Sequence, residues 1–137
     1  MLQDGIQPLH SAQELYSTCD IVSLHIPATP QTKNSINQSL LNLMPQGAIL
    51  INTARKEVIN EEELILFMQE RKDFKYMTDV MPAADKKMNE LFEGRYFATP
   101  KKMGAQTAEA NINAGIAAAK QIVDFFQNGN TQFQLNK

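Results

Sequence analysis

The stretch that decides the fold is Ala48-Ile-Leu-Ile-Asn-Thr-Ala-Arg55. Its first four residues are apolar without interruption, which is typical of a strand covered on both faces in a parallel sheet. Polar residues follow at once, and ligands of open α/β sheets bind just past the carboxyl ends of such strands. Arg55 therefore carries a planar, permanently charged guanidinium to a place where a small anion can bind. The alternative, an ordinary strand followed by a solvated surface arginine, stays open at this point.

The composition limits the classes to which the chain can belong. Its 137 residues are 43% hydrophobic and 20% charged with a net charge of −2, which fits a soluble domain with its own core. This near-neutral charge gives no electrostatic footprint for nucleic acid or an anionic membrane, so neither is expected as a partner. A single cysteine, Cys19, excludes a disulfide framework and a cysteine metal cluster. We therefore expect a cytoplasmic protein without a metal, and no apolar run is long enough to span a bilayer.

Strand and helix patterns alternate on both sides of the opening stretch. Strands are expected at residues 21–26, 48–52, 76–80 and 96–99. Helices are expected from 11 to 18, from a cap at Asn37 or Ser39 to 44, from a cap at Asn60 onward, and from 107 to about 129. Residues 83–94 are polar and charged and are expected to form a loop. This alternation predicts an α/β fold, with a parallel sheet of about four strands and helices on both faces.

Charged side chains are expected at one edge of this sheet, because the carboxyl ends of parallel strands meet there. Four strand ends bring His25, Arg55, Asp79 and the pair Lys101-Lys102 to this edge. The ordinary alternatives, a packed or surface imidazole and solvated lysines, stay open for each residue taken alone.

Several short segments also follow one another in a characteristic order. They are Cys19-Asp-Ile-Val-Ser-Leu-His-Ile-Pro27, Thr29-Pro-Gln-Thr32, Met44-Pro-Gln-Gly-Ala-Ile-Leu-Ile-Asn-Thr-Ala-Arg55, Asp79-Val80, Thr99-Pro100 and Gly104-Ala-Gln-Thr-Ala-Glu-Ala110. Each is weak alone, but together they resemble the NAD-dependent D-2-hydroxyacid dehydrogenase family over roughly residues 11–129. Within that family the chain is most similar to D-3-phosphoglycerate dehydrogenases, in particular to members with lysine where most have histidine.

The resemblance assigns a role to each matching position. It implies a Rossmann-like fold, with residues 1–137 as the C-terminal part of a dinucleotide-binding domain. This range includes an irregular lead-in at 1–10 and a tail at 130–137. It implies that Arg55 binds the carboxylate of a 2-hydroxy or 2-keto acid and polarises its carbonyl group. Asp79 matches the carboxylate that holds the nicotinamide amide. The cofactor-binding positions implied for NAD are His25, Pro27, Thr53, Ala54, Arg55, Asp79, Gly104 and Ala105.

The chain departs from the family pattern at two linked positions. Counting back from Gly104-Ala105 puts Lys102 at the catalytic histidine position, whereas counting from the preceding Thr-Pro pair puts Lys101 there. We favour Lys102, because the spacing to the glycine sets the reach into the site. The acidic partner of that histidine falls on Ala84, although the adjacent Asp85 could replace it.

These two changes make chemical sense together. A histidine needs a carboxylate to hold its tautomer and to keep it protonated near neutral pH. A lysine side chain, with an ordinary pKa of about 10.4, is a proton donor without such support. The alternative is that both lysines are surface charges and that the chain is catalytically inactive.

A third departure is the absence of the phosphate-binding Gly-x-Gly-x-x-Gly. The glycines are at positions 5, 47, 94, 104, 115 and 129, and no two of them stand two apart. The acidic ribose-binding residue that should follow is missing as well. We therefore expect the chain to be the C-terminal part of a longer enzyme, or a truncated product, that is inactive alone. Its expected partners are the missing N-terminal half and further copies of itself, because the edge of strand 21–26 would be open.

Three functions remain in competition from the sequence. The leading hypothesis is hydride transfer between NAD and a 2-hydroxy acid, with 3-phosphoglycerate as the favoured substrate. Glyoxylate or hydroxypyruvate reduction is the runner-up within the same class, because the residues that would read a substrate phosphate are not in this chain. A non-catalytic NAD-sensing or dimerisation module is the alternative from another class.

Overall fold

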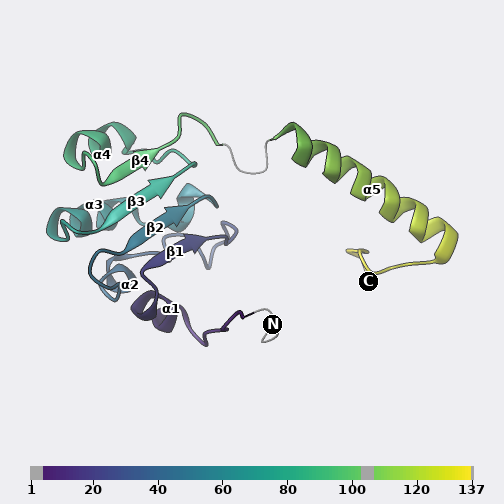
Figure 1. Ribbon diagram of the computed structural model, residues 1–137, viewed down its shortest axis with the longest axis horizontal. Coiled ribbons are helices and arrows are strands. Elements are labelled where there is room, and N and C mark those ends of the chain that lie inside the picture. Colours follow the sequence, from purple (N-terminus) through teal and green to yellow (C-terminus); the bar gives the residue numbers. More distant parts are fainter. Residues whose placement is uncertain (1–4, 103–106, 137) are drawn as a thin grey trace. The chain divides into compact units, whose positions relative to one another are not determined.

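The computed structural model describes residues 5–102 and 107–136, and the chain divides into two units, Met1–Lys102 and Met103–Lys137. Within the described part of the first unit, four parallel strands form one sheet in the order β1-β2-β3-β4 (Figure 1). The predicted parallel α/β sheet of about four strands is therefore confirmed. The strands are β1 (Ile21–Leu24), β2 (Ile49–Asn52), β3 (Lys75–Thr78) and β4 (Tyr96–Ala98).

Three helices of the first unit begin at the caps that the sequence offers. In each case a side-chain oxygen of the cap accepts a hydrogen bond from the backbone amide three residues further on, which satisfies one free amide of the first turn. The second cap is Asn37 and not Ser39, so this open choice is resolved. The helices and their caps are α1 (Ala12–Thr18, cap Ser11), α2 (Gln38–Leu41, cap Asn37) and α3 (Glu61–Glu70, cap Asn60).

Residues 83–94, which we expected to be a loop, contain the helix α4 (Asp85–Leu91). Its own segment provides no side-chain cap. Instead, the carboxylate of Glu61 on α3 accepts hydrogen bonds from the amides of Ala83 and Ala84, both at 3.1 Å. Because this capping group lies 22 residues before Ala83, no local pattern could reveal it. A short 3-10 helix, η2 (Lys56–Val58), was also not predicted.

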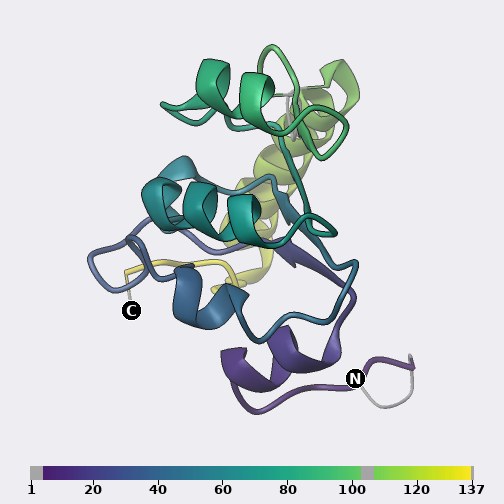
Figure 2. The same ribbon diagram turned by 90° about the vertical axis from the view of Figure 1, so that its left-hand side faces the viewer.

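One face of the sheet forms the core of the first unit. Val22, Leu50, Tyr76 and Tyr96 stand side by side in register across the four strands, and all are buried. The rings of Tyr76 and Tyr96 stack with their centroids 5.8 Å apart. Buried side chains from α1, α2, α3 and α4 belong to the same apolar cluster, and Figure 2 shows these helices gathered on one side of the strands.

The opposite face of the sheet is much less covered within the described part of the first unit. Ile21 is 59% exposed, Met77 37% and Phe97 60%, whereas parallel sheets are normally buried on both faces. The expectation of helices on both faces therefore depends on what lies outside this unit.

The second unit contains one long described helix, α5 (Ala108–Asn128), followed by a short tail. Thr107 caps its start, and Gly129 ends it in the left-handed conformation at φ 66°, which favours glycine. Ile112, Ile116 and Phe126, which share one face of this helix by their spacing, are exposed. None of the described helices is long and apolar enough to cross a membrane.

An ionic clamp joins the loops that precede β2 and β3. The guanidinium of Arg71 donates hydrogen bonds to the carbonyl oxygens of Met44 (3.2 Å) and Pro45 (2.8 Å), and it pairs with Asp73 at 2.8 Å. The amide of Gly47 donates to the same Asp73 carboxylate at 2.6 Å. The Arg71 guanidinium first, and the Gly47 amide second, hold the pKa of the Asp73 carboxyl well below its usual range.

We predict that this clamp makes stability depend on pH. A depressed carboxyl pKa stabilises the fold fully above the unfolded pKa of about 4, and this contribution is lost as the pH falls below that value. Replacing Asp73→Asn should lower the free energy of unfolding by about 1 to 2 kcal/mol at neutral pH. Urea unfolding from pH 7 downward should show the difference from the native chain shrinking below about pH 4.

The matched control is Glu90→Gln, which removes an exposed carboxylate of α4. It should change the free energy of unfolding by no more than about 0.5 kcal/mol at any pH tested. A difference between the native chain and Asp73→Asn that stayed constant with pH would contradict this account.

Candidate active site

The carboxyl ends of β1 and β2 border a small cavity. Its volume is about 320 Å³, at the lower end of the range for ligand pockets, so it suits one ring or a small acid rather than a whole dinucleotide. The residues that line it are His25, Ile26, Pro27, Thr53, Ala54 and Arg55. The cavity thus collects every predicted site residue of the first two strand ends.

Two cationic groups meet at the carbonyl oxygen of Ala54. Nη1 of Arg55 donates a hydrogen bond to this oxygen at 2.8 Å, and Nζ of Lys102 donates to it at 3.1 Å. The same ammonium lies 3.4 Å from the carbonyl oxygen of Thr53. Lys102 follows β4, which is two strands away from β2 in the sheet. The guanidinium and the ammonium therefore reach one point from separate strands.

This arrangement is well suited to binding an anion. Two positive charges share a single neutral acceptor, and a carboxylate would offer each of them a stronger, charge-assisted hydrogen bond. Arg55 is exposed and Lys102 is half-buried, so an incoming anion can reach both groups. The carboxyl end of the sheet can therefore bind a small acid on the Arg55 guanidinium, with the Lys102 ammonium beside the bound acid.

The two lysines have different environments. Lys101 is exposed, and its carbonyl oxygen accepts a hydrogen bond from Oγ1 of Thr99 at 2.8 Å. The half-buried Lys102 instead directs its ammonium to the end of β2. Gly104 and Ala105, the predicted close backbone approach, lie outside the described residues.

The remaining predicted residues also lie at strand ends. Asp79, at the end of β3, is only 7% exposed, and its amide donates to the carbonyl oxygen of Asn52 at 3.2 Å. His25 is exposed, and its Nε2 is hydrogen-bonded to Oγ of Ser23 at 2.9 Å. The carbonyl oxygen of Pro27 accepts a hydrogen bond from Oγ1 of Thr32 at 2.6 Å.

The carboxylate of Asp85 is hydrogen-bonded to residues of α4 and β4. Its Oδ1 accepts hydrogen bonds from the Tyr96 hydroxyl at 2.6 Å and from Nδ2 of Asn89 at 3.2 Å. Burial, and then this carboxylate, raise the pKa of the Tyr96 hydroxyl far above its usual range. The half-buried Ala84 has a methyl side chain and no acid, and its amide donates a hydrogen bond to Glu61 at 3.1 Å. The acidic partner expected for a catalytic histidine therefore has no evident replacement in this loop.

Asn52 belongs to one of the motifs that indicate the family, but the sequence alone assigns it no role. Its side chain is fully buried, and its amide bonds to the backbone on both sides of the Ala54-Arg55 peptide group. The available signal was a polar residue at an inward-facing position of an otherwise apolar strand. Buried polar groups need hydrogen-bond partners, so such a residue is expected to bind the turn that follows.

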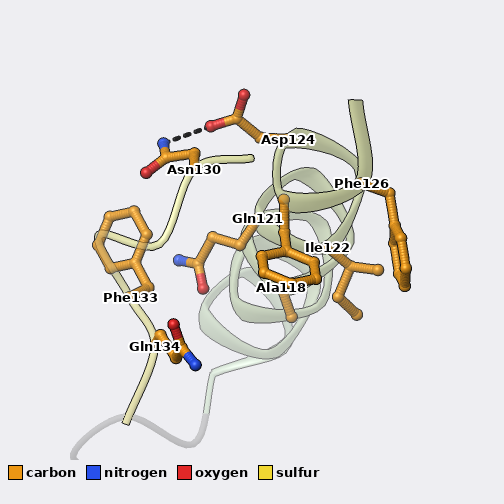
Figure 3. A pocket seen from close by; sticks show the side chains of 9 residues that line it. Ala118, Gln121, Ile122, Asp124, Phe126, Asn130, Phe133 and Gln134 are labelled. Carbon is orange, nitrogen blue, oxygen red and sulfur yellow. Dashed lines mark hydrogen bonds between the residues drawn. The ribbon is translucent and has the colours of Figure 1, made fainter. Parts of the chain in front are cut away.

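A second cavity, in the unit that contains α5, has a volume of about 460 Å³. Figure 3 shows it between the helix, with Gln121 and Ile122, and the returning tail, with Phe133 and Gln134. The carboxylate among its lining residues, Asp124, already accepts hydrogen bonds from Asn128 and Asn130. This cavity therefore offers packing surface rather than chemistry. Among residues 5–102 and 107–136, no cluster of three potential metal ligands occurs.

Residues 2–100 match the family described as D-isomer specific 2-hydroxyacid dehydrogenase, NAD binding domain. The chain belongs to this family. The resemblance drawn from the sequence is confirmed, and with it the assignment to the NAD-binding domain of D-2-hydroxyacid dehydrogenases.

Individual relatives agree with this assignment. The chain is 37% identical over 134 residues to the D-3-phosphoglycerate dehydrogenase of Haemophilus influenzae, covering 93% of this chain and 32% of that protein. It is 36% identical over 98 residues to the erythronate-4-phosphate dehydrogenase of a Shewanella strain, covering 69% and 36%. It is 52% identical to the 3-phosphoglycerate dehydrogenase of Entamoeba histolytica, solved with bound NAD⁺, with a TM-score of 0.80 and coverage of 94% and 42%. The chain thus spans about a third of the length of the curated relatives it matches.

Proposed function

We propose that this chain is part of the NAD-binding domain of an NAD-dependent D-2-hydroxyacid dehydrogenase, and that the complete enzyme acts on D-3-phosphoglycerate. The observation that carries this proposal is the meeting of Arg55 and Lys102 at the carbonyl oxygen of Ala54. One group can hold the acid and the other can exchange a proton with its hydroxyl or carbonyl oxygen. The similarity to two 3-phosphoglycerate dehydrogenases supports the choice of substrate.

Arg55 is proposed to bind the carboxylate of the substrate. Its guanidinium is a planar, bidentate fork that matches a carboxylate, and Arg55 stands three residues after the end of β2. On binding, the substrate would replace the Ala54 carbonyl oxygen as an acceptor of the guanidinium. The same charge lies close enough to polarise a carbonyl group adjacent to that carboxylate.

Lys102 is proposed to be the general acid and base. In the direction of reduction, its ammonium gives a proton to the oxygen that becomes the 2-hydroxyl group. The carbonyl oxygens of Thr53 and Ala54 hold the ammonium in place through its other protons. A lysine that is oriented by backbone carbonyls needs no carboxylate partner, which is consistent with Ala84 at the position of the family's acid.

The residues at this edge fit the nicotinamide half of NAD. Thr53 and Ala54 line a cavity of suitable size for one ring, and the buried carboxylate of Asp79 can accept a hydrogen bond from an amide. Bound NAD would accept or supply the hydride. The sequence contains no Gly-x-Gly-x-x-Gly to bind the pyrophosphate, so we expect this chain alone to bind NAD weakly.

The substrate class is proposed to be a 2-hydroxy acid with a phosphorylated tail. Relatives named for 3-phosphoglycerate and for erythronate 4-phosphate both act on acids of this kind. Arg55 and Lys102 account for the acid and hydroxyl end that these molecules share. Recognition of the phosphate is left to residues outside this chain.

We predict that Lys102→Ala lowers kcat about 10²- to 10⁴-fold in a complete enzyme, because it removes the proton donor. The complete enzyme can be made by placing the N-terminal portion of the Entamoeba histolytica protein before this chain. Turnover is followed by the absorbance of NADH with 3-phosphohydroxypyruvate as substrate. The matched control is Lys101→Ala, whose exposed side chain should matter about twofold at most.

Equal effects of the two substitutions would contradict the assignment of Lys102. Full turnover without Lys102 would remove the proposed proton donor altogether. Absence of turnover in the unsubstituted chimaera, with NADH still bound, would favour the non-catalytic alternative.

We also predict that a histidine can replace Lys102 only if its acidic partner is restored. Lys102→His alone should be at least about tenfold slower than the starting enzyme near neutral pH, because the imidazole lacks a carboxylate that holds it protonated. Adding Ala84→Glu should recover part of this loss and raise the pH at which activity falls. No recovery, with both variants folded by circular dichroism, would contradict the link between the two positions.

The preceding part of the parent protein is proposed as the partner of this chain. β1 is an edge strand of the described sheet, so one side of its backbone is free to pair. Beside it, the less covered face of the sheet exposes Ile21, Met77 and Phe97. A strand with its crossover helix, such as the first half of a dinucleotide-binding domain provides, would close the edge and cover this face. When this partner is absent, we propose that two copies of the chain associate through the edge strand β1.

We predict that the isolated chain associates with itself in a concentration-dependent way. Sedimentation velocity should show species larger than a monomer as the concentration rises. Ile21→Lys should shift the equilibrium toward monomer by about tenfold or more, because it places a charge at the edge strand on the exposed face. The control Leu91→Lys changes another exposed apolar residue, 45% exposed against 59% for Ile21, that lies away from that strand. A monomer at all concentrations, or equal effects of both variants, would argue against this edge.

A further inference from the structure

We propose that Asn52 is a positioning residue whose side chain fixes the direction of the Ala54-Arg55 peptide group, the group on which Arg55 and Lys102 converge. Its consequence for catalysis rests on the proposed function. The positioning itself rests on contacts within this chain and can be tested without any turnover.

Asn52 has both halves of its amide committed to the turn after β2. Oδ1 accepts a hydrogen bond from the amide of Ala54 at 3.0 Å, and Nδ2 donates to the carbonyl oxygen of Arg55 at 3.0 Å. These two backbone groups lie on either side of the Ala54-Arg55 peptide group. Because a peptide group is planar and its neighbours are held, it has little freedom to rotate. The side chain of Asn52 therefore sets where the carbonyl oxygen of Ala54 points.

Asn52 is itself held in place by burial and by hydrogen bonds to its backbone. Asn52 is 0% exposed, so water cannot replace its partners. Its own carbonyl oxygen accepts hydrogen bonds from Oγ1 of Thr78 at 2.8 Å and from the amide of Asp79 at 3.2 Å. The end of β2 is thus tied to the end of β3, where another proposed cofactor-binding residue stands. Loss of the Asn52 side-chain hydrogen bonds would therefore change the conformation of the turn and leave the strand in place.

The position of the Ala54 carbonyl oxygen decides where both cations stand. It accepts from Nη1 of Arg55 and from Nζ of Lys102, and so holds the two groups at a common point before substrate arrives. Misplacement of a catalytic group by about 1 Å can cost about a hundredfold in rate. Removing the Asn52 side-chain hydrogen bonds should therefore affect how the substrate acid is held as well as how fast it reacts.

A purely structural role for Asn52 makes a different prediction. A residue that only stabilises the fold changes the amount of active enzyme, and so changes kcat without changing KM. Asn37 provides the comparison, because it is a partly buried asparagine whose Oδ1, like that of Asn52, accepts a hydrogen bond from a backbone amide, here at the start of α2. Its contacts do not involve the turn after β2.

The experiment compares Asn52→Ala with Asn37→Ala in the complete chimaeric enzyme. For Asn52→Ala we expect the KM for 3-phosphohydroxypyruvate to rise about tenfold and kcat to fall about tenfold, with the KM for NADH changed less than about twofold. For Asn37→Ala we expect a lower Tm and an unchanged KM for both. Unchanged KM for the keto acid in Asn52→Ala, with turnover lowered by Lys102→Ala as predicted above, would overturn this inference and leave the proposed function standing.

A second measurement uses the isolated chain and needs no activity. Proton–nitrogen NMR of the native chain should show the Arg55 guanidinium as ordered, with separate Nη resonances, and Asn52→Ala should average them while the signals of the core stay in place. Should Asn52→Ala fail to fold, Asn52→Ser keeps a small polar side chain that is too short to bond both Ala54 and Arg55, and an effect of the same kind is expected. An equally ordered guanidinium in the folded variant would overturn the inference.

Discussion

The whole arrangement depends on the common direction of the four parallel strands. Because every strand ends at the same edge, residues that are far apart in the chain arrive at one place. The Lys102 ammonium and the Ala54 carbonyl oxygen are 48 residues apart in sequence and 3.1 Å apart in space. The opposite edge carries the Arg71–Asp73 clamp, which holds the loops before β2 and β3 together. The sheet therefore separates the groups that hold it together from the groups that can do chemistry.

Most of the architecture could be predicted because it is locally encoded. A few neighbouring residues are enough to predict a strand from the apolar run before Asn52. The same holds for the starts of three helices, whose caps are Ser11, Asn37 and Asn60. The order of the short sequence motifs then indicated the family. The choice of Lys102 over Lys101 came from spacing, and in the structure it is Lys102 whose ammonium lies at the end of β2.

What could not be predicted depends on partners distant in sequence. The sequence predicts a loop where α4 stands, because the capping group of this helix, Glu61, belongs to another helix. The sequence does not reveal the role of Asn52, because its side chain bonds to the turn after β2. No pattern of residue types describes the conformation of that turn. Whether Asp85 could stand in for an acid at position 84 was open for the same reason. Only the packing of α4 against β4 shows that Tyr96 already holds this carboxylate.

The bond between Glu61 and the loop after β3 has a consequence for how this family can evolve. Glu61 grips the main chain at positions 83 and 84 and leaves their side chains out of the contact. Either side chain can therefore be exchanged by mutation while the path of the loop is preserved. A lineage in which a lysine had taken over proton transfer would feel no selection to retain an acid at position 84, and drift to a residue as small as Ala84 would cost the fold little.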